Sequence, residues 1–143
     1  MAKLKVSEVV SLSPQAAWER AADLSRFDEW LQIHDGWRCE LPTELHEGLQ
    51  LTSVVSVKGM RNRIDWTMTE YAPIDHIKLK GHGKGGTKVD LVLSIAPKGD
   101  HATFTLEVDF SGPMLFGLVG SGVARALKGD VQRSLEAFSA LSD

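Results

Sequence analysis

The 143-residue sequence predicts an α+β fold in which a curved antiparallel sheet of seven strands wraps around a long C-terminal helix. Over most of the chain before residue 113, apolar and polar residues alternate with the two-residue period of strands. Glycine- and proline-containing turns separate consecutive strands, as in antiparallel hairpins. After residue 112 the period becomes helical and leaves one apolar stripe. A sheet with one apolar face buries such a stripe most economically by curving around the helix.

The first predicted strand covers residues 3–12. Leu4, Val6 and Val10 alternate there with lysines and serines, which is typical of a half-buried strand. Glu8 falls on the apolar side of this alternation. We expect its carboxylate either near the exposed edge of its strand or inside a wet interior.

Two short helices are predicted next. Ser13 and Pro14 form a helix start, with serine as the N-cap and proline at the first helical position. Trp18 and three alanines share one face of this helix. A second helix is expected over about residues 25–31, and it carries Trp30. Because so few residues separate the two helices, we expect a bent pair.

Six more strands follow, and consecutive hairpins predict an antiparallel meander. We place them at residues 37–41, 49–57, 64–68, 77–82, 89–95 and 102–110. The glycine-rich segment 81–86, GHGKGG, lacks the spacing of a nucleotide-binding loop and lies between two strands. It therefore predicts a hairpin turn.

The last element is a helix over residues 113–141. Its apolar stripe consists of Phe116, Val123, Leu127, Val131, Leu135, Phe138 and Leu141. Three glycines in its first half, at 117, 120 and 122, disfavour a helix interior and indicate a kink, a close backbone approach or an unfilled volume. If the helix is unbroken, Gly120 faces the sheet.

The composition excludes several function classes. The net charge is −3, with 16 basic and 19 acidic residues, so the sequence gives no general electrostatic signal for nucleic-acid binding. The single cysteine, Cys39, rules out an internal disulfide and fits a reducing compartment. No apolar run is long enough to span a membrane, and the N-terminus lacks a signal-peptide pattern, so we expect a cytoplasmic protein. The five histidines are scattered, and we predict neither a metal site nor a cofactor.

The N-terminal segment carries a resemblance to a known family. Pro14, Trp18, Asp23, Phe27 and Trp30 follow the pattern P-x3-W-x4-D-x3-(aromatic)-x2-W. This pattern resembles the opening of the START-like (SRPBCC) superfamily, which includes polyketide cyclases, birch-pollen-allergen-type proteins and lipid-transfer domains. The resemblance covers the whole chain. It implies a single helix-grip domain over residues 1–143, with a hydrophobic cavity between the sheet and the last helix.

A narrower resemblance concerns the segments LSRFDEWL, VKGMRNRIDWT and GPMLFG followed by ALKGD. They are similar to a small actinobacterial member described as the toxin of a type II toxin–antitoxin pair, which implies a small antitoxin protein as partner. In one respect the chain departs from the superfamily, because Glu8 stands where most members have an apolar residue. The pocket is therefore expected to be more polar than usual.

Three functions are compatible with these features. The first is a carrier or sensor that binds a small hydrophobic molecule in the cavity, and the nearly all-apolar inward rows favour it. The second is a toxin, and the third is a cyclase or aromatase, which would need paired polar groups. Only Glu8 and His34 offer such groups, and no catalytic residue is predicted. The predicted ligand-binding residues are Trp66, Met68, Leu91, Leu93, Phe104, Leu106, Phe116, Gly120, Val123, Glu8, Trp30 and His34.

Overall fold

The structure is a computed structural model that describes residues 2–57, 59–112 and 117–140. Its strands are β1 (Ala2–Val10), β2 (His34–Trp37), β3 (Gln50–Val57), β4 (Met60–Ala72), β5 (His76–His82), β6 (Lys88–Lys98) and β7 (His101–Ser111). Its helices are α1 (Pro14–Ala21), the 3-10 turn η1 (Leu24–Arg26), α2 (Phe27–Trp30), the 3-10 turn η2 (Lys84–Gly86) and α3 (Gly117–Ala140).

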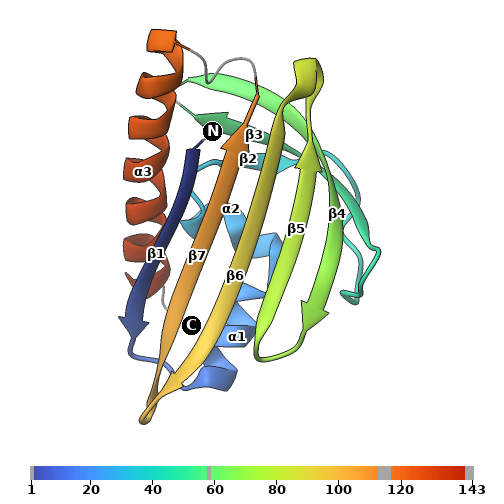
Figure 1. Cartoon of the computed structure of the whole chain (residues 1–143). Helices are drawn as coiled ribbons and strands as arrows, with labels where there is room; N and C mark the ends of the chain where they lie inside the picture. The colour runs from blue at the N-terminus through green and yellow to red at the C-terminus, as the bar shows by residue number, and fades with distance from the viewer. Residues whose placement is uncertain (1, 58, 113–116, 141–143) are drawn as a thin grey trace.

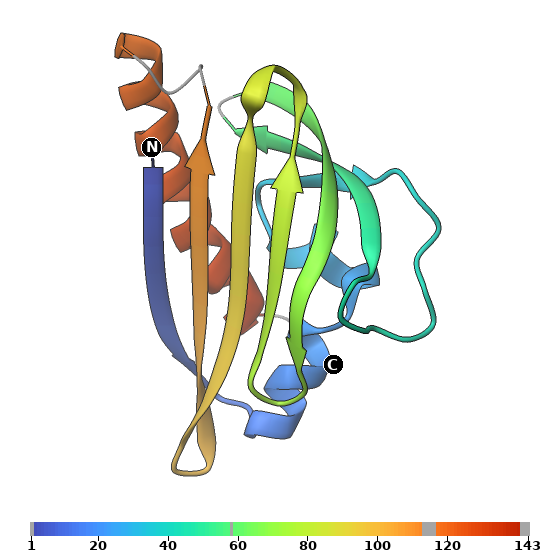
Figure 2. The same cartoon turned by 45° about the vertical axis from the view of Figure 1, so that its right-hand side comes forward.

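All seven strands form one antiparallel sheet in the order β1-β7-β6-β5-β4-β3-β2. The sheet curves, with α3 beside β1 and the short helices α1 and α2 behind its concave face (Figure 1). The turned view shows that the connection between β2 and β3 projects from the side opposite α3 (Figure 2). This arrangement confirms the predicted seven-stranded sheet, the two short helices and the C-terminal helix.

The start of α1 is stabilised as predicted. The hydroxyl oxygen of Ser13 accepts a hydrogen bond from the backbone N–H of Ala16 at 3.1 Å, and Pro14 occupies the first turn. The second predicted helix is instead divided into η1 and a single turn, α2. Asp23 explains the division, because its carboxylate accepts hydrogen bonds from both the N–H and the hydroxyl of Ser25 and so caps a separate turn.

The strand predicted at residues 37–41 lies earlier, and β2 ends at Trp37. Gly36 has a φ of +98°, and the pairing of β2 with β3 shifts register at this point. Arg38 still donates its N–H to the carbonyl of Thr52, but the N–H of Thr52 donates to the sulfur of Cys39. Regular pairing therefore stops where alternation alone predicted a strand to begin.

The glycine-rich segment forms the predicted turn between β5 and β6, and it contains η2. Gly85 and Gly86 have φ values of +67° and +80°, a region that residues with a Cβ rarely adopt. The three glycines of α3 do not interrupt it, because α3 is one helix from Gly117 to Ala140.

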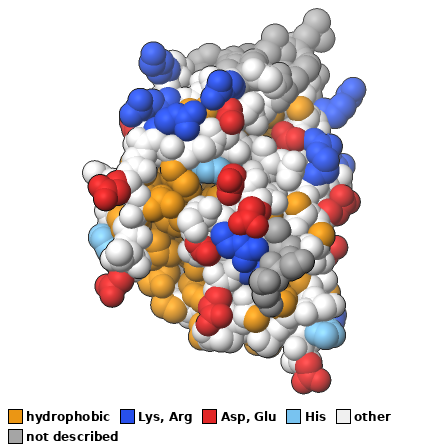
Figure 3. Space-filling model, turned by 180° about the vertical axis from the view of Figure 1, so that it is seen from behind, with side chains coloured by type: hydrophobic (Ala, Val, Ile, Leu, Met, Phe, Trp, Pro, Cys, Tyr) orange, Lys and Arg blue, Asp and Glu red, His pale blue; other side chains and the backbone are white. Residues whose placement is uncertain are grey.

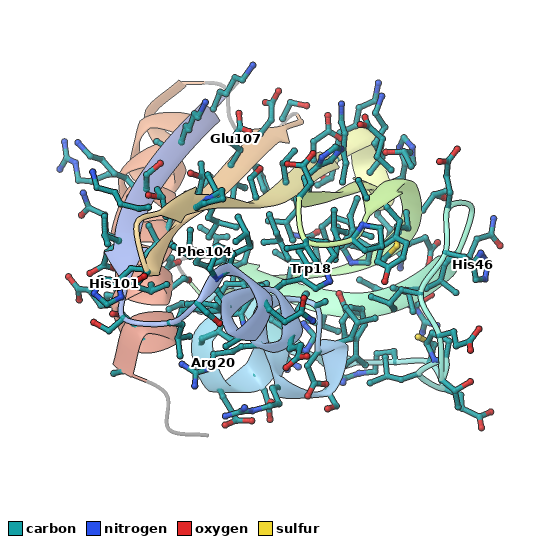
Figure 4. The ribbon with its side chains drawn as sticks, turned by 90° about the horizontal axis from the view of Figure 1, so that it is seen from below. Trp18, Arg20, His46, His101, Phe104 and Glu107 are labelled. Carbon is teal, nitrogen blue, oxygen red and sulfur yellow. The ribbon has the colours of Figure 1, made fainter. Side chains whose placement is uncertain are left out.

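The core lies between the concave face of the sheet, the short helices and the second half of α3. The described part of the helical stripe is buried, namely Leu127, Val131, Leu135 and Phe138. Phe138 packs on Phe104 of β7 with ring centroids 4.1 Å apart, and Trp30 contacts both rings edge-on at 5.3 and 5.5 Å. Figure 4 shows this layer of side chains from below, with Phe104 and Trp18 inside it and Glu107 on the outer side of the sheet. The second half of α3 thus packs directly on the sheet.

No described helix has both the length and the apolar character needed to cross a membrane.

Candidate functional site

An apolar pocket opens at the end of the core where α2, β2 and β3 meet. It is lined by Phe27, Leu31, Ile33, His34, Trp37, Ser53, Val55, Trp66, Leu79 and Leu91. Eight of these side chains are buried, whereas His34 and Trp37 are half-buried and therefore form the mouth. The enclosed volume is about 10 Å³, which is room for one water molecule. A larger ligand must displace side chains, and the half-buried side chains at the mouth have the most room to move.

His34 contributes the titratable group of this pocket. Its ring centroid lies 4.8 Å from that of Trp37, and it meets the ring of Phe27 almost perpendicularly at 6.0 Å. Burial lowers the pKa of His34, and the nearby carboxylates Asp28 and Asp35 oppose that effect without cancelling it. The imidazole is therefore mainly neutral at pH 7, so one ring nitrogen can donate and the other can accept a hydrogen bond.

Ser53 contributes a hydroxyl at the floor. It is 1% exposed, and its oxygen accepts a hydrogen bond of 2.8 Å from the indole N–H of Trp66. Trp66 also packs tightly on Gly81 of the neighbouring strand, because a Cβ added at Gly81 would lie only 2.8 Å from the indole ring. The floor of the pocket is thus held by one hydrogen bond and one close backbone approach.

Trp37 connects the mouth of the pocket to η1. Its indole N–H donates a hydrogen bond of 2.8 Å to the carbonyl of Leu24. This bond fixes one edge of a side chain that is otherwise half-buried. The indole can therefore be displaced at the cost of one hydrogen bond and its ring contacts.

The structure brings together only some of the predicted ligand-binding residues. Trp66, Leu91 and His34 line the pocket. Five others are buried deeper in the core without lining it, namely Met68, Leu93, Phe104, Leu106 and Trp30. Phe116 lies outside the described residues, and so do the side-chain surroundings of Gly120 and Val123.

Glu8 lies apart from the pocket. It is half-buried in a surface groove between β1 and α3, with Gln132, Leu135 and Glu136 opposite. Its strand partner is Phe104, so it is on the concave side of the sheet, but β1 is an edge strand. Of the two positions expected for this carboxylate, this surface groove corresponds to the one near the exposed edge of the strand.

Ser53 and Trp37 line the pocket but were not among the predicted ligand-binding residues, and the sequence contained a signal for Ser53 only. Ser53 stands in an inward row of β3 whose other members, Leu51, Val55 and Val57, are apolar. A hydroxyl in an apolar row usually has a specific hydrogen-bond partner. Trp37 was assigned to a strand, but its distance of three residues from His34 gave no sign that the rings would meet across a bulge.

A second polar cluster lies on the outer face of the sheet. His76 contacts the carboxylate of Glu70 through Nε2 at 2.9 Å and that of Asp75 through Nδ1 at 3.1 Å. Hydrogen bonding to Glu70, and then to Asp75, raises the pKa of His76. Among the described residues, no group of three or more histidine, cysteine, aspartate or glutamate side chains is arranged to hold a metal ion.

Comparison with known proteins assigns the chain to a family. The sequence profile of the family described as "Polyketide cyclase / dehydrase and lipid transport" matches residues 1–143. The chain belongs to this family. Toxin Rv0910 of Mycobacterium tuberculosis is 46% identical to it over 138 residues, which cover 96% of each chain. The predicted family resemblance is thus confirmed, including the similarity to a protein named as a toxin.

Solved structures support the fold of this polyketide cyclase/dehydrase family member. A START superfamily protein from Mycobacterium smegmatis is 21% identical, with a TM-score of 0.63 over 92% of this chain and 98% of its own. The protein TTHA0849 from Thermus thermophilus is 14% identical, with a TM-score of 0.77 over 96% of this chain and 94% of its own. At these identities the likeness concerns the fold, and it confirms the helix-grip architecture.

Proposed function

We propose that this protein binds a small apolar molecule with one hydrogen-bonding group in the pocket whose mouth is formed by His34 and Trp37. One observation carries the proposal: a mainly neutral imidazole lies half-buried between aromatic rings at the mouth of an otherwise apolar pocket. Ligand sites typically combine apolar walls with a few placed polar groups. The family description, which includes lipid transport, is consistent with such a role.

The geometry favours a ligand with a single flat ring. Trp37 and Phe27 present aromatic faces and edges near the mouth, which suit a planar group. The neutral His34 suits a hydroxyl or carbonyl on that ring, because it can donate or accept. The small enclosed volume disfavours long acyl chains unless the pocket opens well beyond its present shape.

Dye titration tests this proposal. We expect an environment-sensitive apolar dye to bind the native protein saturably at about one-to-one ratio with micromolar affinity. The variant Leu79→Phe adds bulk to the pocket wall and should abolish binding. His101→Ala is a control, because His101 is exposed at the start of β7, away from the pocket. Equal binding by the folded Leu79→Phe protein would contradict the proposal.

The relative named as a toxin favours a second candidate function. We propose as the alternative that the protein inhibits growth and that a small antitoxin protein neutralises it, because a protein 46% identical over 96% of its length carries that name. Induced expression in a related host should then stop growth, and co-expression of the neighbouring small protein should restore it. Unaffected growth at a verified expression level would exclude this function in that host.

The polar groups that line the pocket favour binding over catalysis. A cyclase-type reaction needs a general acid and a general base near the substrate. His34 is the one titratable side chain among the described residues that line the pocket, and Glu8 lies in a separate groove. We therefore propose a carrier or sensor.

A further inference from the structure

Another hollow lies on the surface between α1, η1, the end of β4 and the connection between β2 and β3. Two adjoining depressions of about 580 and 310 Å³ share Ala22, Asp23 and Leu45 in their walls. We call their combined surface the α1 groove. It is separate from the ligand pocket, with which it shares no lining residue.

The floor of the α1 groove contains apolar side chains. Trp18 and Tyr71 form an aromatic pair there, with ring centroids 6.1 Å apart. Leu41 and Leu45 extend the floor along the β2–β3 connection, and both are half-buried. Figure 3 shows apolar side chains gathered on this side of the molecule, with acidic side chains around them. Apolar surface gathered in this way often marks a protein–protein contact.

The rim of the α1 groove is acidic. Glu19, Asp23 and Glu44 line it, and no lysine, arginine or histidine is among its described lining residues. Glu19 accepts a hydrogen bond from the side chain of Gln15, and Asp23 accepts hydrogen bonds from the N–H and the hydroxyl of Ser25. The rim therefore places three carboxylates next to apolar side chains.

We infer that the α1 groove docks a segment of a protein partner that carries apolar side chains flanked by lysine or arginine. Charge complementarity identifies this class of partner, because cations near the rim gain attraction while their neighbouring apolar groups cover the floor. Nucleic acids and anionic membrane surfaces are disfavoured by the same carboxylates. The inference is independent of the small-molecule proposal, because it uses different residues.

Two matched helical peptides test the inference against the whole protein. Both carry leucines on one face, and the other face carries lysines in one peptide and glutamates in the second. Fluorescence anisotropy should show saturable binding of the lysine peptide, weakened by salt, and no binding of the glutamate peptide. Equal binding of the two peptides would overturn the inference, because it would leave no role for the acidic rim.

Matched variants distinguish an effect of the α1 groove on peptide binding from an effect of the protein's net charge. Glu44→Lys reverses one rim charge on an exposed connection and should weaken binding of the lysine peptide about tenfold. Asp100→Lys changes the net charge equally in the exposed β6–β7 turn and should leave binding unchanged. Leu45→Ser should also weaken binding while the melting temperature stays close to that of the wild type. Equal losses in the two lysine variants, or full binding by Leu45→Ser, would overturn the inference.

A second copy of this chain is the competing occupant of the α1 groove. Sedimentation analysis of the wild-type protein at the concentrations used for the titration should give a monomer mass. A dimer that Glu44→Lys dissociates would assign the groove to a second copy of this chain and overturn the inference.

Discussion

His34 shows how its surroundings set the charge of a single residue. Desolvation between Phe27 and Trp37 lowers the pKa of His34, so the folded protein takes up this proton at a lower pH than the unfolded chain. As the pH falls below the unfolded value of about 6.5, the unfolded state gains the proton first, and stability decreases until the folded pKa is passed. Protonation also removes the acceptor nitrogen, so a ligand whose hydroxyl donates to His34 loses its hydrogen bond.

We therefore predict that NMR titration gives His34 a pKa below the unfolded value of about 6.5, and that dye affinity is constant near neutral pH and falls as the pH drops through that pKa. In His34→Gln, which retains a donor and an acceptor, affinity should become independent of pH in this range. A pKa at or above the unfolded value would contradict the assignment of a desolvated imidazole.

His76 should behave in the opposite sense. Hydrogen bonds from its ring to Glu70 and Asp75 raise its folded pKa, so its contribution to stability is fully present below the unfolded value and is lost as the pH rises through the folded value. We predict that the difference in melting temperature between wild type and His76→Ala is largest in mild acid and shrinks above neutral pH. A difference in melting temperature that stays constant over this pH range would contradict this assignment.

Ser53 tests the cost of one buried hydrogen bond. Ser53→Ala leaves the indole N–H of Trp66 without its acceptor in a site that is 4% exposed. We predict a loss of about 1–3 kcal/mol in the free energy of unfolding, measured by urea denaturation. Ser56→Ala lies on the same strand at a position that faces away from the core, and it should change the free energy by less than about 0.5 kcal/mol.

At the scale of elements, the pairing of β4 with β5 positions the floor of the pocket. Gly81 lies directly opposite Trp66, and a Cβ there would approach Ile64 to 2.5 Å and the indole to 2.8 Å. We predict that Gly81→Ala costs about 1–3 kcal/mol, because the added methyl group overpacks the site. It should also shift the emission of Trp66 and weaken dye binding. Ser94→Ala in β6 is a control, and unchanged stability in Gly81→Ala would show that the indole moves freely.

The sequence was sufficient to predict the strand order of the meander, the cap at Ser13, the turn at 81–86 and the part of the buried α3 stripe that the structure describes. These features depend on the local periodicity of apolar residues and on cap and turn residues that interact with residues close to them in sequence. The position of β2 was wrong, because the bulge at Gly36 depends on pairing with β3. The pocket was predicted only in part, since the contact between His34 and Trp37 arises from that same bulge. The orientation of Gly120 toward the sheet remains a prediction.

At the scale of the whole molecule, Trp37 links the ligand pocket to the α1 groove. Its ring lines the pocket, its N–H donates to the carbonyl of Leu24, and Leu24 lines the groove. A ligand that displaces the indole breaks this bond between the pocket and η1, so we expect the two proposed binding events to be coupled.

We predict that saturating dye changes the affinity of the lysine peptide, and that saturating peptide changes dye affinity by the same factor, as thermodynamic linkage requires. Trp37→Phe lacks the N–H and should reduce the coupling while both sites still bind. Identical peptide affinity with and without dye would show that the sites are independent.

The pairing of β1 with β7 has a consequence for biosynthesis. Ala2 pairs with Phe110 and Val10 with Ala102, so roughly 90 to 110 residues separate the partners. At synthesis rates of about 5–20 residues per second, β1 leaves the ribosome roughly 5 to 20 s before β7 is complete. Throughout that interval its apolar face and its backbone have no partner in the sheet. Lys3 and Lys5, which alternate with that face, discourage pairing with other nascent chains. The lysines of β1 thus protect the chain before the fold exists.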